Sequence, residues 1–279
     1  MTIGILHEPD FENRVSLMPE EAAALIKKKV HVLLETNAGT NAFASNVAYA
    51  ASGVEVLDRA QVLSKADVLL AIHPPGDLPP GKCIIGVFQP LFQHALMHAW
   101  AQQHITSFSL DMIPRTTRAQ SMDVLSSQAN VAGYKAVLLA AQSYGRYFPM
   151  FMTAAGSIKP AKVLILGAGV AGLQAIATAK RLGAVVEVFD TRSAVKEEVM
   201  SLGAKFVEVE GAADASKAGG YAVEQSEDYK QKQQDRIAEA IAKADIVITT
   251  AQIPGKKAPV LITEAKIRTI LKASVIVDM

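Results

Sequence analysis

The sequence has a single cysteine, Cys83, among its 279 residues, so no disulfide can form within the chain. It also lacks an opening charged segment followed by an apolar one, which is the pattern of a secretory leader. Both absences favour a reducing compartment, and we expect a cytoplasmic protein.

An excess of charge and long apolar runs are missing as well. The 28 Lys and Arg residues are balanced by 27 Asp and Glu residues, for a net charge of +1, which gives no support for a nucleic-acid partner. The longest apolar stretch, 163–179, contains three glycines and a glutamine, and it falls short of the roughly 20 residues that a membrane helix needs. We therefore expect neither a nucleic-acid partner nor a direct membrane span.

Half of the residues are hydrophobic, and short apolar runs alternate with helical patterns along the chain. Strands that alternate with helices predict parallel pairing and a sheet covered on both faces. The predicted strands are 2–6, 30–35, 53–57, 66–72, 83–88 and 105–110, followed by a strand–turn–helix–strand unit at 161–190 and strands near 204–209, 244–251 and 273–279.

The length suits two domains of about 130 to 150 residues each. We predict an N-terminal α/β domain at 1–125 and a Rossmann domain at 126–279, with a long linking helix at 126–147. The fold class is therefore α/β, with two Rossmann-like domains, parallel sheets and a nucleotide cleft between them. The chain stops on what looks like a core strand, so we expect the natural chain to continue past Met279.

A glycine motif gives the clearest functional signal. Gly167, Gly169 and Gly172 fit the pattern G-x-G-x-x-G between an apolar strand and a helix, and Asp190 ends the next strand. In such a motif the glycines permit a tight turn, approach of the backbone to a pyrophosphate and close packing of the helix, while the acid accepts ribose hydroxyls. The negative charge of Asp190 favours NAD over NADP, although Arg192 could accommodate a 2′-phosphate.

A second signal is the polar run "RTTRAQSMDVLSSQANVAGYKAV" at 115–137, which leads directly into a helical pattern. Capping of the helix could use one or two of these hydrogen-bonding groups but not six. Together with "GAGVAG", "DTR", "GGYA" and "TTAQIPGKKAPVLIT", this run resembles the NAD(H)-binding domain of proton-translocating nicotinamide nucleotide transhydrogenase, the alpha subunit in bacteria. The resemblance covers the whole chain.

The resemblance implies an enzyme that is active only with a partner. Hydride would pass directly between NAD(H) on this chain and NADP(H) on the NADP-binding domain of the beta subunit, and the membrane domain would couple the transfer to proton translocation. It also implies a homodimer, peripheral on the inner face of the cytoplasmic membrane through its partner subunit.

The resemblance also implies site residues. Arg115, Gln120 and Asp123 match catalytic positions that orient the nicotinamide at its end of the cleft, because hydride transfer between two nicotinamides needs alignment and moves no substrate proton. Gly220 and Tyr221 match a mobile loop that covers the nucleotide. The remaining matches to NAD-contact positions are Ser126, Val170, Thr191, Arg192, Gln233 and Gln252.

Two alternatives stay open at this point. By comparison with its family, alanine dehydrogenase would use an arginine at the position of Arg14 for the substrate carboxylate, but it also needs a proton donor. The lysine that this family has after the strand at 66–72 is replaced here by His73. Its histidine after the strand at 83–88 is replaced by the "QPLFQ" run ahead of His94. A non-catalytic NAD-binding module would need no polar run at 115–126. The histidines show no metal-ligand spacing, so we expect no metal.

Overall fold

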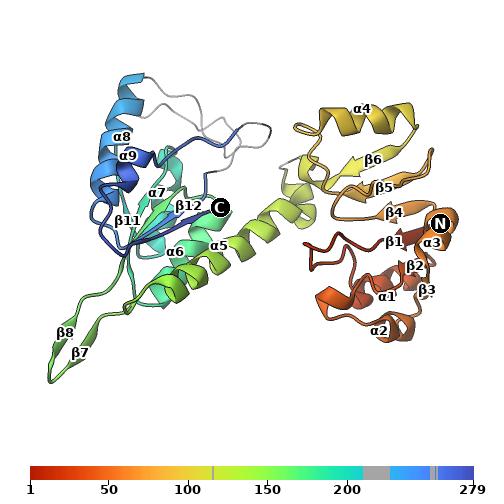
Figure 1. Cartoon of the computed structure of the whole chain (residues 1–279), viewed down its shortest axis with the longest axis horizontal. Coiled ribbons are helices and arrows are strands. Elements are labelled where there is room, and N and C mark those ends of the chain that lie inside the picture. Colours follow the sequence, from red (N-terminus) through yellow and green to blue (C-terminus); the bar gives the residue numbers. More distant parts are fainter. Residues whose placement is uncertain (115, 210–226, 252–254, 256) are drawn as a thin grey trace. The chain divides into compact units, whose positions relative to one another are not determined.

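Figure 1 shows a computed structural model of the chain, which describes residues 1–114, 116–209, 227–251, 255 and 257–279, with the backbone alone for 227–230. The chain forms two compact units, Met1–Val124 and Leu125–Met279. Each unit has hydrophobic clusters on both faces of its own parallel sheet.

The first unit contains a six-stranded parallel sheet in the order β3-β2-β1-β4-β5-β6. The strands run β1 (Thr2–Ile5), β2 (His31–Glu35), β3 (Glu55–Leu57), β4 (Val68–Leu70), β5 (Cys83–Gly86) and β6 (Thr106–Ser109). The helices are α1 (Pro19–Lys27), η1 (Thr40–Ala42), α2 (Asn46–Ala51), α3 (Arg59–Lys65), α4 (His94–Gln102), η2 (Leu110–Met112) and η3 (Thr117–Met122). The strand order reverses between β1 and β4, which makes their carboxyl ends the switch point of this sheet.

The alternating side chains of β2 show that both faces of this sheet are covered. Leu33 packs in a cluster with Leu69 and Trp100 on one face, whereas Val32 and Leu34 pack with other residues on the opposite face. All three β2 side chains are buried, as expected for a strand with helices on both sides.

The second unit contains a five-stranded parallel sheet in the order β11-β10-β9-β12-β13. Its strands are β9 (Lys162–Leu166), β10 (Val185–Phe189), β11 (Lys205–Phe206), β12 (Ile246–Thr249) and β13 (Val275–Asp278). Its helices are α5 (Val124–Ser143), which begins at the last residue of the first unit, α6 (Val170–Arg181), η4 (Ser193–Val195), α7 (Lys196–Ser201), α8 (Glu227–Ile241) and α9 (Glu264–Ile267). The order reverses between β9 and β12, so the glycine turn after β9 lies at the switch point.

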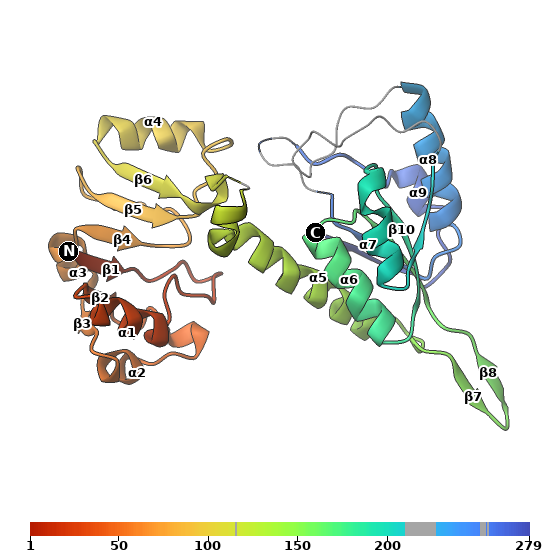
Figure 2. The same cartoon turned by 180° about the vertical axis from the view of Figure 1, so that it is seen from behind.

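An antiparallel hairpin, β7 (Phe151–Thr153) and β8 (Gly156–Ile158), belongs to neither sheet. Both views show it extending away from the rest of the second unit (Figure 1, Figure 2). The sequence pattern did not predict this hairpin, because it is short and lacks the Asn-Gly or Asp-Gly turn that signals one.

The predicted fold class, α/β with two Rossmann-like parallel sheets, is confirmed. The long helix was predicted at 126–147 but spans Val124–Ser143, so it begins and ends slightly earlier. It packs closely on α6 at Gly133, where an added Cβ would lie only 2.1 Å from the carbonyl oxygen of Ala171. Among the described residues, no helix is long and apolar enough to cross a membrane.

Candidate functional site

The glycine turn after β9 is shaped by Gly167. Its φ is +107°, in the region that favours glycine, and its N–H donates to the carbonyl oxygen of Phe189 at 2.8 Å. A Cβ at Gly167 would lie 2.5 Å from Oγ1 of Thr250. This glycine is therefore required both by the backbone conformation and by the contact with the end of β12.

The other two glycines have different surroundings. A Cβ at Gly172 would lie 2.0 Å from the carbonyl oxygen of Gly167, so the first turn of α6 can approach the strand only without a side chain there. At Gly169, by contrast, a Cβ would meet nothing within 4 Å. Gly169 is the N-cap residue of α6, and the first N–H groups of a helix have no carbonyl partner within it. The space beside Gly169 thus suits an anionic group approaching the helix N-terminus.

Asp190 lies directly after β10, and its side chain is only 6% exposed. Its Oδ2 accepts the N–H of Ala168 at 2.7 Å, which ties it to the glycine turn. Its Oδ1 accepts the backbone N–H of Arg192 at 2.8 Å. The predicted ribose acceptor is therefore at the same switch point as the glycine turn.

Arg192 also holds Asp190 through its side chain. Its Nε donates to Oδ1 at 2.9 Å and its Nη2 to Oδ2 at 2.7 Å, and this pairing is the main reason that the pKa of Arg192 is raised. With four accepted hydrogen bonds, the carboxylate of Asp190 has its lone pairs occupied. A ribose hydroxyl would have to displace one of these donors, most simply the guanidinium.

The polar run lies on a different element. Gln120 is an exposed residue of η3, Asp123 follows η3 and is partly buried, and Ser126 lies in the first turn of α5. Thr116, which precedes η3, makes no side-chain capping bond to it, so capping of η3 does not account for this hydroxyl.

The remaining predicted site residues are placed unevenly. Val170 is the first residue of α6 and Thr191 follows Asp190, so both lie at the carboxyl edge of the second sheet. Gln233 is a buried residue of α8, away from the glycine turn in sequence. The predicted positions outside the described residues are Arg115, Gly220, Tyr221 and Gln252.

Two residues that support the site were missed from the sequence. Thr250 donates its Oγ1 hydrogen to the carbonyl oxygen of Gly167 at 3.0 Å and so fixes the turn from β12. Gly133 sets the approach of α5 to the start of α6. The available signals were a hydroxyl residue near the end of a predicted buried strand, for Thr250, and a glycine inside a helical pattern, for Gly133.

In the first unit, Arg14 and His73 share one acidic partner. Arg14 donates to Glu12 from Nε at 2.8 Å and from Nη2 at 2.6 Å, and Nε2 of His73 lies 2.9 Å from Oε2 of Glu12. The hydrogen bond from Arg14 is the first cause of a pKa of Glu12 lowered to about 2. Because this carboxylate pairs with the arginine, the geometry offers little to a substrate carboxylate. Among the described residues, no group of three or more His, Cys, Asp or Glu side chains could hold a metal ion.

Comparison with known proteins gives consistent matches over both units. The family models for the alanine dehydrogenase/PNT N-terminal and C-terminal domains match residues 4–132 and 136–279. The NAD(P) transhydrogenase subunit alpha (first part) of Rickettsia prowazekii is 45% identical over 278 residues, which cover 96% of this chain and 73% of that protein. The crystal structure of transhydrogenase from Sinorhizobium meliloti has a TM-score of 0.86 at 40% identity, over 99% of this chain and 77% of that one.

Alanine dehydrogenase is more distant. The enzyme of Mycolicibacterium smegmatis is 27% identical over 292 residues, which cover 100% of this chain and 72% of that protein. The difference from the transhydrogenase values confirms the resemblance found in the sequence.

The glycine turn, the helix that it opens and the buried acid after the next strand define a doubly wound α/β protein of the nucleotide-binding class. The chain belongs to the alanine dehydrogenase/PNT family, and within it to the NAD(P) transhydrogenase alpha subunits. Membership implies a nicotinamide nucleotide as ligand, and the name of the relatives, subunit alpha, implies a complex with other subunits.

Proposed function

We propose that this chain binds NAD(H) at the carboxyl edge of its second sheet and exchanges hydride directly with NADP(H) on a partner. The single observation that supports this most is the open space beside Gly169, next to a buried acid and at the start of α6. A pyrophosphate there would meet the free N–H groups of the helix, and the adenosine ribose would reach Asp190.

We propose that Asp190 makes the site selective for NAD over NADP. Its carboxylate would accept hydroxyls of the ribose and repel a 2′-phosphate. Arg192 moderates that repulsion in the ligand-free chain, because it neutralises the carboxylate. Val170, Thr191, Gln233 and the residues outside the described ranges, Gly220, Tyr221 and Gln252, are proposed as further nucleotide contacts.

The nicotinamide end of the dinucleotide is proposed to be oriented by Arg115, Gln120, Asp123 and Ser126. NAD(H) supplies the hydride acceptor or donor at its nicotinamide ring. Since no substrate proton moves in this exchange, the role of these side chains is to hold the ring at near-attack distance, about 3 to 3.5 Å, from its counterpart. Such a role suits amide, hydroxyl and carboxylate groups and requires no general acid or base.

We also propose the assembly that this chemistry needs. The partner would be the NADP-binding domain of a beta subunit, with a membrane domain that couples the transfer to proton translocation. The chain would act as a homodimer, peripheral on the inner face of the cytoplasmic membrane, with 1–125 as an N-terminal domain and 126–279 as the NAD-binding domain.

The test is a reconstitution. The chain is mixed with an NADP(H)-loaded partner domain, and reduction of an NAD analogue by NADPH is followed. A second sample holds the chain with pyruvate, ammonium and NADH. Turnover only with the partner supports the proposal, and Asp190→Ala should then weaken NADH binding. Turnover only with pyruvate and ammonium would replace the proposal with an alanine dehydrogenase activity.

A further inference from the structure

At the switch point of each sheet, an acidic side chain at the end of one strand accepts a backbone N–H from the segment that follows the neighbouring strand. In the second unit, Leu166 is the register partner of Phe189, and the next residue after Phe189, Asp190, accepts the N–H of Ala168. The N–H donor, Ala168, thus lies two residues after the last residue of β9. The acid, Asp190, lies one residue after the register partner of that last residue.

In the first unit, Ile5 ends β1 and is the register partner of Leu34. The next residue, Glu35, accepts the N–H of His7 at 2.8 Å. The donor again lies two residues beyond the strand end and the acid one residue beyond its register partner. An arginine completes the repeat, because Arg59 pairs with Glu35 as Arg192 pairs with Asp190. Glu35 therefore occupies the position in its sheet that a ribose-binding acid occupies in a dinucleotide domain.

A cavity of about 320 Å³ lies at this point. Its polar lining comes from the carboxyl ends of β1, β2 and β4 and from the start of α3: His7, Glu8, Glu35, Arg59 and His73. This is the crevice in which open parallel sheets bind their ligands, and its volume is in the lower part of the range for small-molecule sites, about 300 to 1,000 Å³.

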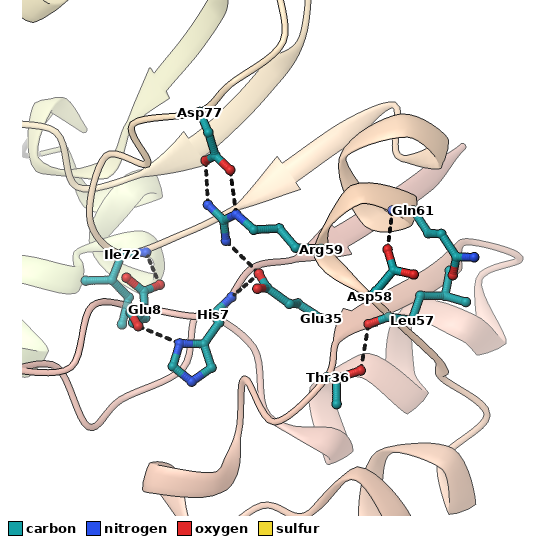
Figure 3. Close-up of polar contacts among 10 residues, drawn as sticks. All are labelled: His7, Glu8, Glu35, Thr36, Leu57, Asp58, Arg59, Gln61, Ile72 and Asp77. Carbon is teal, nitrogen blue, oxygen red and sulfur yellow. Dashed lines mark hydrogen bonds and ion pairs between the residues drawn. The ribbon is translucent and has the colours of Figure 1, made fainter.

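The cavity offers hydrogen-bond acceptors to which no described residue donates. The His7 N–H and Arg59 Nη1, at 2.8 and 2.7 Å, both donate to Oε2 of Glu35, so Oε1 has no donor among the described residues (Figure 3). Nδ1 of His7 lies 2.6 Å from the carbonyl oxygen of Glu8 and must carry the proton, because a carbonyl only accepts. The neutral ring then presents Nε2 as a second acceptor.

Arg59 does not close the site in the way that Arg192 closes the other. Its Nε and Nη2 are held by Asp77 at 2.7 and 2.6 Å, and it reaches Glu35 through Nη1 alone (Figure 3). A ligand hydroxyl could therefore bind Glu35 without displacing the guanidinium.

A phosphate, in contrast, would not be accepted. The two N–H groups after β4, of Ile72 and His73, already donate to the buried carboxylate of Glu8 at 2.6 and 3.0 Å. The segment that follows β1 contains no glycine, so it offers an anion no nest of N–H groups. The nearby cations are already paired, Arg14 with Glu12 and Arg59 with Glu35 and Asp77.

We propose that this crevice binds the vicinal diol of an uncharged ribonucleoside, with Glu35 Oε1 and His7 Nε2 as acceptors for its hydroxyls. The lining of this crevice shares no residue with the proposed NAD(H) site, and the proposal does not depend on that site.

The test is equilibrium dialysis of radiolabelled adenosine against the full chain saturated with NADH, up to about 5 mM, which covers dissociation constants near 1 mM. We expect one adenosine per chain beyond the bound NADH, and binding of 2′-deoxyadenosine weaker by about tenfold, as for the loss of one charge-assisted hydrogen bond. Without NADH, the Asp190→Ala chain should still bind one adenosine per chain in this crevice, so the result stands even if the proposed NAD(H) site fails.

Glu35→Gln should weaken adenosine binding by about tenfold. Glu55→Gln is the matched control, because Glu55 is an ion-paired glutamate on the neighbouring strand, outside the cavity lining. His7→Leu removes the second acceptor while leaving the backbone N–H on Glu35, and it should also weaken binding. The proposal is overturned if NADH-saturated chain binds no adenosine, if the deoxynucleoside binds equally well, or if folded Glu35→Gln and His7→Leu both retain full affinity.

Discussion

Arg192 can influence which nucleotide the second unit prefers, because it is the cation closest to the proposed ribose acceptor. In Arg192→Ala the carboxylate of Asp190 keeps its two backbone donors, and the guanidinium no longer offsets its negative charge. We expect the ratio of the NADPH to the NADH dissociation constant to rise by about tenfold, the effect of losing one charge-assisted contact to the 2′-phosphate. Fluorescence titration of both nucleotides measures it.

Arg181→Ala provides the control, since Arg181 is an exposed arginine at the end of α6. It should leave the ratio unchanged. An Arg192→Ala chain that still discriminates as the original does would remove Arg192 from the selectivity argument.

Glu12 should make the stability of the chain depend on pH in the acid range. Its pKa is lowered from 4.5 to about 2, first by the hydrogen bond from Arg14, so its contribution to stability is complete above pH 4.5 and is lost as the pH falls towards 2. Because Arg14 is half exposed, screening limits the effect to about 1 to 2 kcal/mol.

In urea unfolding at pH 7 and pH 3, Glu12→Gln should lose less stability on acidification than the original chain. Glu20→Gln, an exposed change on α1, should behave like the original. Equal pH dependence in all three chains would show that the Glu12–Arg14 pair contributes nothing.

Residue identities were easier to predict from the sequence than the contacts between them. The positions of Gly167, Gly172 and Asp190 follow from a motif with a mechanical reason for each residue. The closure of Asp190 by Arg192 depends on a side-chain conformation that no spacing encodes. The role of Glu35 depends on the register between β1 and β2, which places its side chain beside His7, a residue far from it in sequence.

At the scale of one helix, experiment can distinguish the role of Gly172, inside α6, from that of Gly169, its N-cap residue. Gly172→Ala should destabilise the second unit by about 2 kcal/mol or more, because the new methyl group would meet the carbonyl oxygen of Gly167. Gly169→Ala should change stability by less than about 1 kcal/mol, because nothing lies within 4 Å, yet it should weaken NADH binding by filling the space proposed for the pyrophosphate.

Urea unfolding and NADH titration of both variants check this pair. A Gly169→Ala chain that binds NADH normally would place the pyrophosphate elsewhere. A Gly172→Ala chain of undiminished stability would show that the turn can relax around a side chain.

The β7–β8 hairpin is the element that best fits the proposed homodimer. Met150, Phe151, Met152 and Ile158 are all exposed on or beside it, with Met152 at 71%, and Tyr147 stacks on Phe151 with ring centroids 5.4 Å apart. A two-stranded hairpin is marginal alone, and apolar groups gathered on it indicate a contact surface. A second copy of the chain can cover it reciprocally across a two-fold axis.

Phe151→Ser with Met152→Ser should therefore raise the dimer dissociation constant by at least about tenfold, measured by sedimentation equilibrium. Met200→Ser, an exposed change on α7, should have no effect. A double variant that dimerises as strongly as the original would exclude the hairpin from the interface.

The elements themselves show where sequence patterns are informative. The buried strands were predicted because continuous apolar runs bounded by turns are typical of parallel sheets. The hairpin was missed because three-residue strands carry too little periodicity, and the boundaries of α5 shifted because the residues near both of its ends are compatible with helix and with coil.

At the scale of the whole molecule, the only tryptophan makes the two units distinguishable. Trp100 is a buried residue of α4, in the first unit, so its fluorescence reports unfolding of that unit, whereas far-UV circular dichroism reports both. The proposed NADH contacts are also divided: Gln120 and Asp123 belong to the first unit, and the glycine turn with Asp190 belongs to the second.

A ligand stabilises whatever folded part it contacts, by about 2.7 kcal/mol at a hundred times its dissociation constant. ADP, which carries only the adenosine and pyrophosphate half, should raise the thermal transition seen by circular dichroism and leave the Trp100 transition unchanged. NADH should raise both, because its nicotinamide half would engage Gln120 and Asp123. In a Gln120→Ala, Asp123→Ala chain NADH should behave like ADP. If NADH shifts only the circular dichroism transition in the original chain, the nicotinamide contacts proposed for 115–123 are wrong, whereas a shift of the Trp100 transition by ADP would mean that the two units unfold together.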